Sequence, residues 1–60
     1  MTKFTVLVLG NIEDKAKEAG YFALHAHNVT QVEIEAKSKC AAEKIANQFG
    51  KALYSYITLL

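Results

Sequence analysis

A strict alternation of apolar and polar side chains in residues 29–36 constrains the fold of this chain more than any other feature. Successive side chains of a β-strand point to opposite faces of the sheet, so the alternation predicts a strand with one buried and one polar face. The buried face comprises Thr30, Val32, Ile34 and Ala36, and the polar face comprises Gln31, Glu33 and Glu35. A sheet that is polar on one face must be covered by other elements on its second face, which predicts an α+β domain.

A helix is predicted directly after this strand. Ser38 is a favourable N-cap residue, and Gly50 is a favourable residue just beyond a helix end. Residues 39–49 between them carry one apolar stripe at helical spacing, formed by Ala42, Ile45, Ala46 and Phe49. Two further strands are predicted at residues 3–9 and 53–60, which are rich in β-branched, aromatic and apolar side chains.

Residues 12–27 admit two interpretations. Small apolar residues recur there at helical spacing, so the first interpretation is a helix over residues 12–27. Its weak point is Gly20, because glycine is about 1 kcal/mol less favourable than alanine inside a helix. If Gly20 instead ends a shorter helix, residues 21–27 become a strand, although His27-Asn28 then lacks the glycine that tight hairpins prefer. We adopt the long helix and keep the strand as the alternative.

The sequence therefore predicts one α+β domain over residues 1–60, with a three-stranded sheet covered on one face by two helices (βαβαβ). The alternative is a miniature ferredoxin-like layout in the order βαββαβ. The predicted core consists of apolar side chains between sheet and helices: Phe4, Val6, Val8, Ile12, Val32, Ile34, Ile45, Ala46, Phe49, Leu53 and Ile57.

Residues 53–60 contain no charged residue, proline or glycine, so this strand lacks the usual protection of a sheet edge. A chain of this length buries only about 60% of the surface exposed by its unfolded form, and its single cysteine, Cys40, excludes an internal disulfide. Small domains of this kind are commonly stabilised by oligomerisation, so we expect a homodimer. A lone cysteine also fits a reducing compartment, and no apolar stretch has the length of a membrane span, so the expected location is the cytoplasm.

His25, His27 and Cys40 are the candidate metal-ligating or nucleophilic side chains. A stable zinc site needs three or four ligands, and a cysteine nucleophile needs a base that a third group orients. The sequence supplies neither arrangement. We therefore expect no enzyme activity, no metal ion and no cofactor.

The predicted partner-binding residues are Tyr54, Tyr56, Thr58, Glu33 and Glu35, which we expect on one exposed face of the sheet. Exposed tyrosines are typical of protein interfaces, and they can also stack on nucleic-acid bases. The two glutamates repel phosphate, the chain has no arginine, and its net charge is only +1. These features disfavour nucleic acid, so a protein is the expected partner.

Residues 32–50, VEIEAKSKCAAEKIANQFG, combine a strand, an Ala-x-Ser turn and a helix with alanines every three or four positions. This segment resembles archaeal ribosomal LX-type proteins and very small phage-encoded inhibitors of the anti-CRISPR kind. The second resemblance implies a non-catalytic protein that occludes a host protein or defence complex in the host cytoplasm. The first implies contact with ribosomal RNA, but its basic, arginine-containing character is missing here. The sequence-based interpretation is therefore an inhibitor that binds protein as a homodimer, with a small RNA-binding protein as the alternative.

Overall fold

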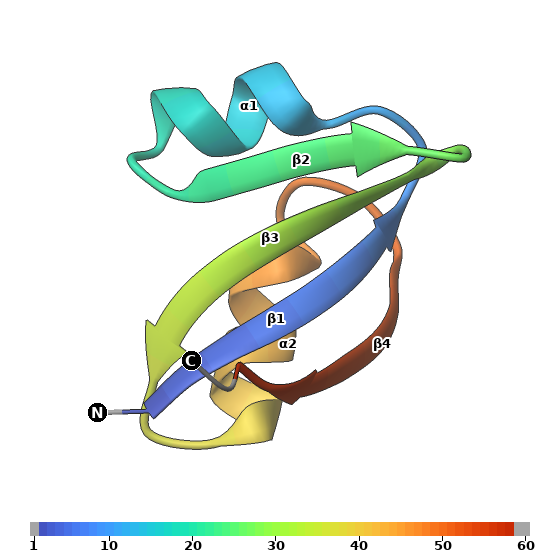
Figure 1. The fold of residues 1–60 in the computed structure, drawn as a ribbon. Coiled ribbons are helices and arrows are strands. Elements are labelled where there is room, and N and C mark those ends of the chain that lie inside the picture. The colour runs from blue at the N-terminus through green and yellow to red at the C-terminus, as the bar shows by residue number, and fades with distance from the viewer. Residues whose placement is uncertain (1, 59–60) are drawn as a thin grey trace.

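The computed structural model describes residues 2–58 of the chain. Four strands form one antiparallel sheet in the order β2-β3-β1-β4, comprising β1 (Thr2–Leu9), β2 (Phe22–Ala26), β3 (Val29–Ala36) and β4 (Ala52–Ile57). Figure 1 shows α2 (Lys39–Ala46) behind the sheet and α1 (Glu13–Glu18) beside β2. The predicted three-stranded βαβαβ sheet is therefore wrong, and the ferredoxin-like βαββαβ alternative is compatible with the observed order.

Gly20 ends α1 and thereby explains the additional strand. Its φ angle is +92°, and its N–H donates to the carbonyl oxygen of Lys17 at 3.0 Å, while the Tyr21 N–H donates to that of Ala16 at 3.0 Å. These two bonds form a Schellman motif, which satisfies the last helical carbonyls and needs a left-handed residue. The helix predicted over residues 12–27 is therefore wrong in its second half, most of which forms β2.

The hairpin between β2 and β3 turns at His27 and Asn28. Both residues have positive φ angles, +52° and +66°, which is the requirement of a type I′ turn. Asparagine and histidine are among the non-glycine residues that adopt this conformation most often. The turn therefore forms without glycine, and Ala26 pairs with Val29 directly across it.

Helix α2 is bounded by side-chain hydrogen bonds. The Ser38 Oγ accepts a hydrogen bond from the Ala41 N–H at 3.2 Å, which confirms Ser38 as the N-cap. The helix ends earlier than the predicted Phe49, because Asn47 is its C-cap. The Asn47 side-chain oxygen also accepts a hydrogen bond from the Ala52 N–H at 3.0 Å, which ties the helix end to the start of β4.

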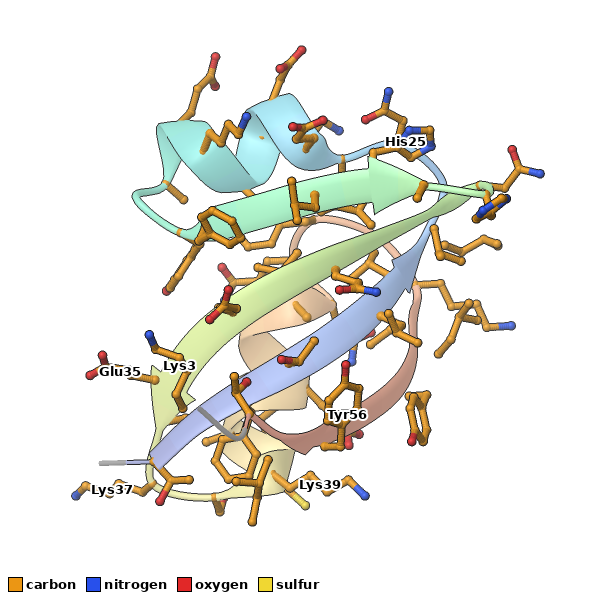
Figure 2. All side chains as sticks on the ribbon, viewed as in Figure 1. Lys3, His25, Glu35, Lys37, Lys39 and Tyr56 are labelled. Atoms are coloured by element: carbon orange, nitrogen blue, oxygen red, sulfur yellow. The ribbon has the colours of Figure 1, made fainter. Side chains whose placement is uncertain are left out.

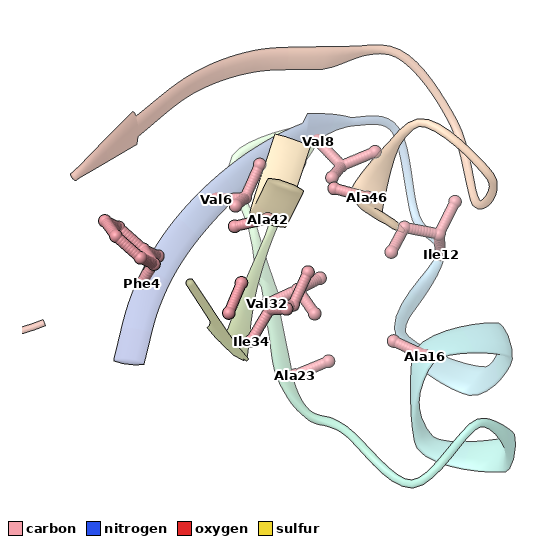
Figure 3. Packing of buried hydrophobic residues seen from close by; sticks show 11 residues of the cluster. Phe4, Val6, Val8, Ile12, Ala16, Ala23, Val32, Ile34, Ala42 and Ala46 are labelled. Atoms are coloured by element: carbon pink, nitrogen blue, oxygen red, sulfur yellow. The ribbon is translucent and has the colours of Figure 1, made fainter. Parts of the chain in front are cut away.

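Small side chains occupy much of the core between the helices and the sheet (Figure 3). The buried hydrophobic residues are Phe4, Val6, Val8, Ile12, Ala16, Ala23, Val32, Ile34, Ala36, Ala42 and Ala46. Five of these are alanines, and methyl groups allow helix and sheet backbones to approach closely. Ala36 and Ala42 were predicted on the buried strand face and on the apolar helix stripe, whereas the burial of Ala16 and Ala23 was not predicted.

The predicted core is confirmed except on β4 and at the end of α2. Ile45 and Phe49 are only partly buried against the core. Leu53 and Ile57 are 47% and 54% exposed, so their assignment to the core is wrong.

A register shift explains the error at Leu53. Leu7 pairs with Tyr54 but Val8 pairs with Ala52, so Leu53 has no partner on β1. The buried residue of β4 is Ser55, which lies two positions beyond Leu53. The predicted strand also included residues 59–60, which lie outside the described residues.

Candidate functional site

Within residues 2–58, no helix covers one face of the sheet, and we call this face the open face. Side chains of paired residues on neighbouring strands point to the same side of a sheet. Ala23, Val32, Val6 and Ser55 form one such row across all four strands, and all four are buried toward the helices. The adjacent rows therefore point away from the helices, as Figure 2 shows for Tyr56, which projects in front of the sheet.

Two cross-strand rows form the centre of the open face. The first row is Phe22, Glu33, Thr5 and Tyr56, and the second is Leu24, Gln31, Leu7 and Tyr54, each in the order β2, β3, β1, β4. Both rows place polar residues on β3 and large apolar or aromatic residues on the two edge strands. We call Phe22 and Leu24 the β2 margin and Tyr54 and Tyr56 the β4 margin; their exposed fractions range from 40% to 57%.

The open face is hollowed between these margins. A shallow groove of about 250 Å³ is lined by Thr5, Phe22, Leu24, Gln31, Glu33, Tyr56 and Thr58. A second hollow of about 340 Å³ is lined by Lys3, Gly20, Tyr21, Phe22, Glu33 and Glu35. Phe22 and Glu33 line both, so the two hollows adjoin at these residues.

The polar groups of the open face are only partly paired. The Lys3 ammonium lies 3.7 Å from a carboxylate oxygen of Glu33, and the hydroxyls of Thr5 and Thr58 are hydrogen-bonded to each other. Glu35 has no ion-pair partner among residues 2–58. One lysine against two glutamates leaves these strands with a net negative charge on the open face.

The structure places all five predicted partner-binding residues on the open face. Tyr54 and Tyr56 lie on β4 and Thr58 directly after it, while Glu33 and Glu35 lie on β3, and β1 runs between the two strands. The tyrosines and the glutamates are therefore about 10 Å apart, which is twice the spacing of neighbouring strands. Their role in binding stays a prediction.

The β2 margin was missed because residues 12–27 were assigned to one helix. The signal that could have found it is the alternation of Phe22, Leu24 and Ala26 in the strand alternative. Paired with β3, Phe22 lies opposite Glu33 and Leu24 opposite Gln31, so both extend the open face.

The histidines and the cysteine considered above do not form a site. His25 lies on β2 at the end of the molecule remote from the start of α2, where Cys40 is exposed (Figure 2). His27 lies in the hairpin turn. Within residues 2–58, no group of three or more histidine, cysteine or acidic residues could hold a metal ion. In the same part of the chain, no helix has the length and apolar composition of a membrane span.

The pKa shifts that the structure produces lie on α1, outside the open face. A hydrogen bond from the Lys17 ammonium to the Glu13 carboxylate, 2.8 Å long, lowers the pKa of Glu13 and raises the pKa of Lys17. Lys17 is exposed and Glu13 is half-buried, and this ion pair confirms the helical spacing of the two residues.

No protein-family model, curated protein or solved structure matches this chain. Its function is therefore inferred from the open face.

Proposed function

We propose that this chain is a non-catalytic protein-binding module that acts by covering part of its partner's surface with the open face. The observation that carries the proposal is the exposure of large apolar and aromatic side chains on both margins. Phe22, Leu24 and Tyr54 are each more than half exposed, and Tyr56 is 40% exposed. Neighbouring exposed apolar groups with polar surroundings mark interaction sites, and aromatic residues are enriched there.

The charges of the open face indicate the chemistry of the partner. The groove between the margins offers apolar walls at Phe22 and Tyr56 and a polar floor at Glu33. Glu35 remains open to a cation from outside the chain, whereas Lys3 already lies beside Glu33. We therefore expect a partner that inserts an apolar side chain into the groove and places a lysine or arginine near Glu35.

A nucleic-acid partner is the second candidate. The rings of Tyr54 and Tyr56 lie 5.5 Å apart at an angle of 44°, so they form an exposed aromatic surface on which bases could stack. The central strands weigh against this candidate, because β3 presents two carboxylates and β1 presents no aromatic side chain to the open face. A phosphate backbone that crosses the sheet would pass over these carboxylates.

Paired substitutions on each margin test the proposal. The variants Tyr54→Ala/Tyr56→Ala and Phe22→Ala/Leu24→Ala remove exposed side chains, so both should stay folded by circular dichroism. With partners captured from a lysate of the native source, each variant should retain about tenfold less of the specific partner, a loss typical of interface hot spots. Lys44→Ala/Gln48→Ala is the matched control, because these residues are exposed on the helix side.

Capture that survives both margin variants, or that is lost equally in the control, would contradict the proposal. Binding of single-stranded RNA at physiological salt, with an affinity that falls steeply as salt is raised, would instead support the second candidate.

A further inference from the structure

The outer side of β4 is an unpaired strand edge. In the sheet order, β4 is bonded to β1 on one side and has no neighbouring strand on the other within residues 2–58. Figure 1 shows that α1 lies alongside the opposite edge strand, β2, whereas no described element lies along the outer side of β4. The two edges therefore differ in their access to a further strand.

The hydrogen bonds to β1 identify the backbone groups that are free on this edge. The Thr58 N–H donates to the carbonyl oxygen of Lys3 at 2.9 Å, so these two residues form a hydrogen-bonded pair. Such pairs alternate along an antiparallel ladder. Tyr56 and Tyr54 therefore also direct their N–H and C=O groups toward β1, while Ser55 and Ile57 direct theirs outward.

The side chains of this segment leave the edge accessible. Residues 52–58 contain neither a charged residue nor a proline, the two commonest devices that prevent edge pairing. The irregularity at Leu53 interrupts only the start of β4, and residues 54–57 pair with β1 in regular register. The Ser55 hydroxyl donates to the Glu43 carboxylate inside the chain, so it needs no new partner when the edge is covered.

We propose that a second copy of this chain occupies the edge, with the two β4 strands antiparallel about a twofold axis at Ser55. In this register the outward N–H and C=O groups of Ser55 bond to those of Ser55 in the second copy. Tyr54 then lies opposite Tyr56 of the second copy, and Leu53 opposite Ile57. Every exposed apolar group on the strand thus meets another, which is the self-complementarity that a twofold interface requires.

The dimer forms one sheet of eight strands, in which both open faces lie on the same side. Tyr54 and Tyr56 contribute to this seam as well as to the open face, but the two proposals fail separately, because the dimer is tested by crosslinking and mass while the proposed function is tested by partner capture. Two short strands bury less surface than a standard protein interface, so we expect a dimer that dissociates at micromolar concentration.

Disulfide trapping tests the register. In a Cys40→Ser background, Tyr54→Cys and Tyr56→Cys variants are oxidised separately and as an equal mixture. Opposite residues of a non-hydrogen-bonded pair have Cα atoms about 4.5 Å apart, within the range of about 4.4–6.8 Å that a disulfide spans. The mixture should give a linked dimer, while each variant alone should give little. A stronger crosslink of either variant with itself, or none in any sample, would overturn the proposed pairing.

A proline substitution tests whether the backbone edge holds the dimer. Ile57→Pro removes an N–H that points outward, and proline is tolerated at such positions of edge strands. Ile57→Val keeps the N–H and is the matched control. By light scattering from micromolar to millimolar concentration, the wild type and Ile57→Val should approach twice the 6.6 kDa of one chain, while folded Ile57→Pro stays at 6.6 kDa. A monomeric wild type, or an Ile57→Pro variant that is folded and still dimeric, would refute the proposal. If the proline variant does not fold, the disulfide crosslinks test the proposal instead.

Discussion

Replacement of Gly20 by alanine tests the turn that creates β2. The φ angle of +92° lies in the region that is about 1–2 kcal/mol unfavourable for residues with a side chain. No atom lies within 4 Å of the position that a Cβ would take, so the substitution adds no steric clash. Alanine also restricts the unfolded chain, which offsets about 0.4–1 kcal/mol. The free energy of unfolding should therefore fall by about 1 kcal/mol, and Tm by about 4–8 °C in a domain of this size.

The sign of this change separates the two interpretations of residues 12–27. Inside a continuous helix, the same substitution would replace a helix-interior glycine and stabilise the chain by about 1 kcal/mol. D-alanine at position 20 provides the matched control, since a D-residue favours the positive φ angle that Gly20 adopts. This variant should be more stable than wild type by about 0.4–1 kcal/mol.

The assay is urea denaturation followed by circular dichroism on three synthetic chains that differ only at position 20. The expected order of stability is D-alanine, glycine, L-alanine. An L-alanine chain as stable as wild type, or a shift of both alanine variants in the same direction, would refute the assignment of Gly20 to a left-handed helix end.

Two further substitutions test local contacts, each measured by the same denaturation. The buried Thr30 hydroxyl donates a hydrogen bond to the carbonyl oxygen of Gly10 and accepts one from the Ile12 N–H. Thr30→Val removes both bonds and should lower the free energy of unfolding by about 2–3 kcal/mol. A loss below about 0.5 kcal/mol would show that these groups find other partners. Ser38→Ala should cost about 1 kcal/mol by removing the N-cap of α2, while Ser38→Asp should retain most of it. Equal stability of the two Ser38 variants would argue against the cap.

Elements that depend on local signals were predicted well. The strand at residues 29–36 follows from alternation, and the start of α2 follows from Ser38, since both signals lie within a few residues of the structure they determine. The segment around β2 was not predicted, because its two boundaries depend on left-handed conformations. At Gly20 the sequence was compatible with a helix interior or a helix end, and at His27-Asn28 the turn forms without its preferred residue.

The open face was predicted in part for the same reason. Alternation alone places Tyr54 and Tyr56 on the side of the sheet that Glu33 shares, as the register confirms. The β2 margin could not be predicted without knowing that residues 21–27 are not helical. The exposure of Leu53 could not be predicted without knowing the register shift between β1 and β4. Both depend on pairing between segments that are distant in sequence, for which the local pattern carries little information.

Because of the five buried alanines, this chain should tolerate larger side chains on the open face of the sheet but not at these positions on the helix side. A larger side chain at Ala16, Ala23, Ala42 or Ala46 must push a helix from the sheet, and such overpacking costs about 1–3 kcal/mol. That is a large share of the roughly 3–9 kcal/mol expected for a chain of this length. No element of the described residues lies above the open face, so added volume there meets no helix. Sequence variation can thus reshape the binding surface of this small domain, while the alanine positions on its helix side admit no larger side chain at low cost.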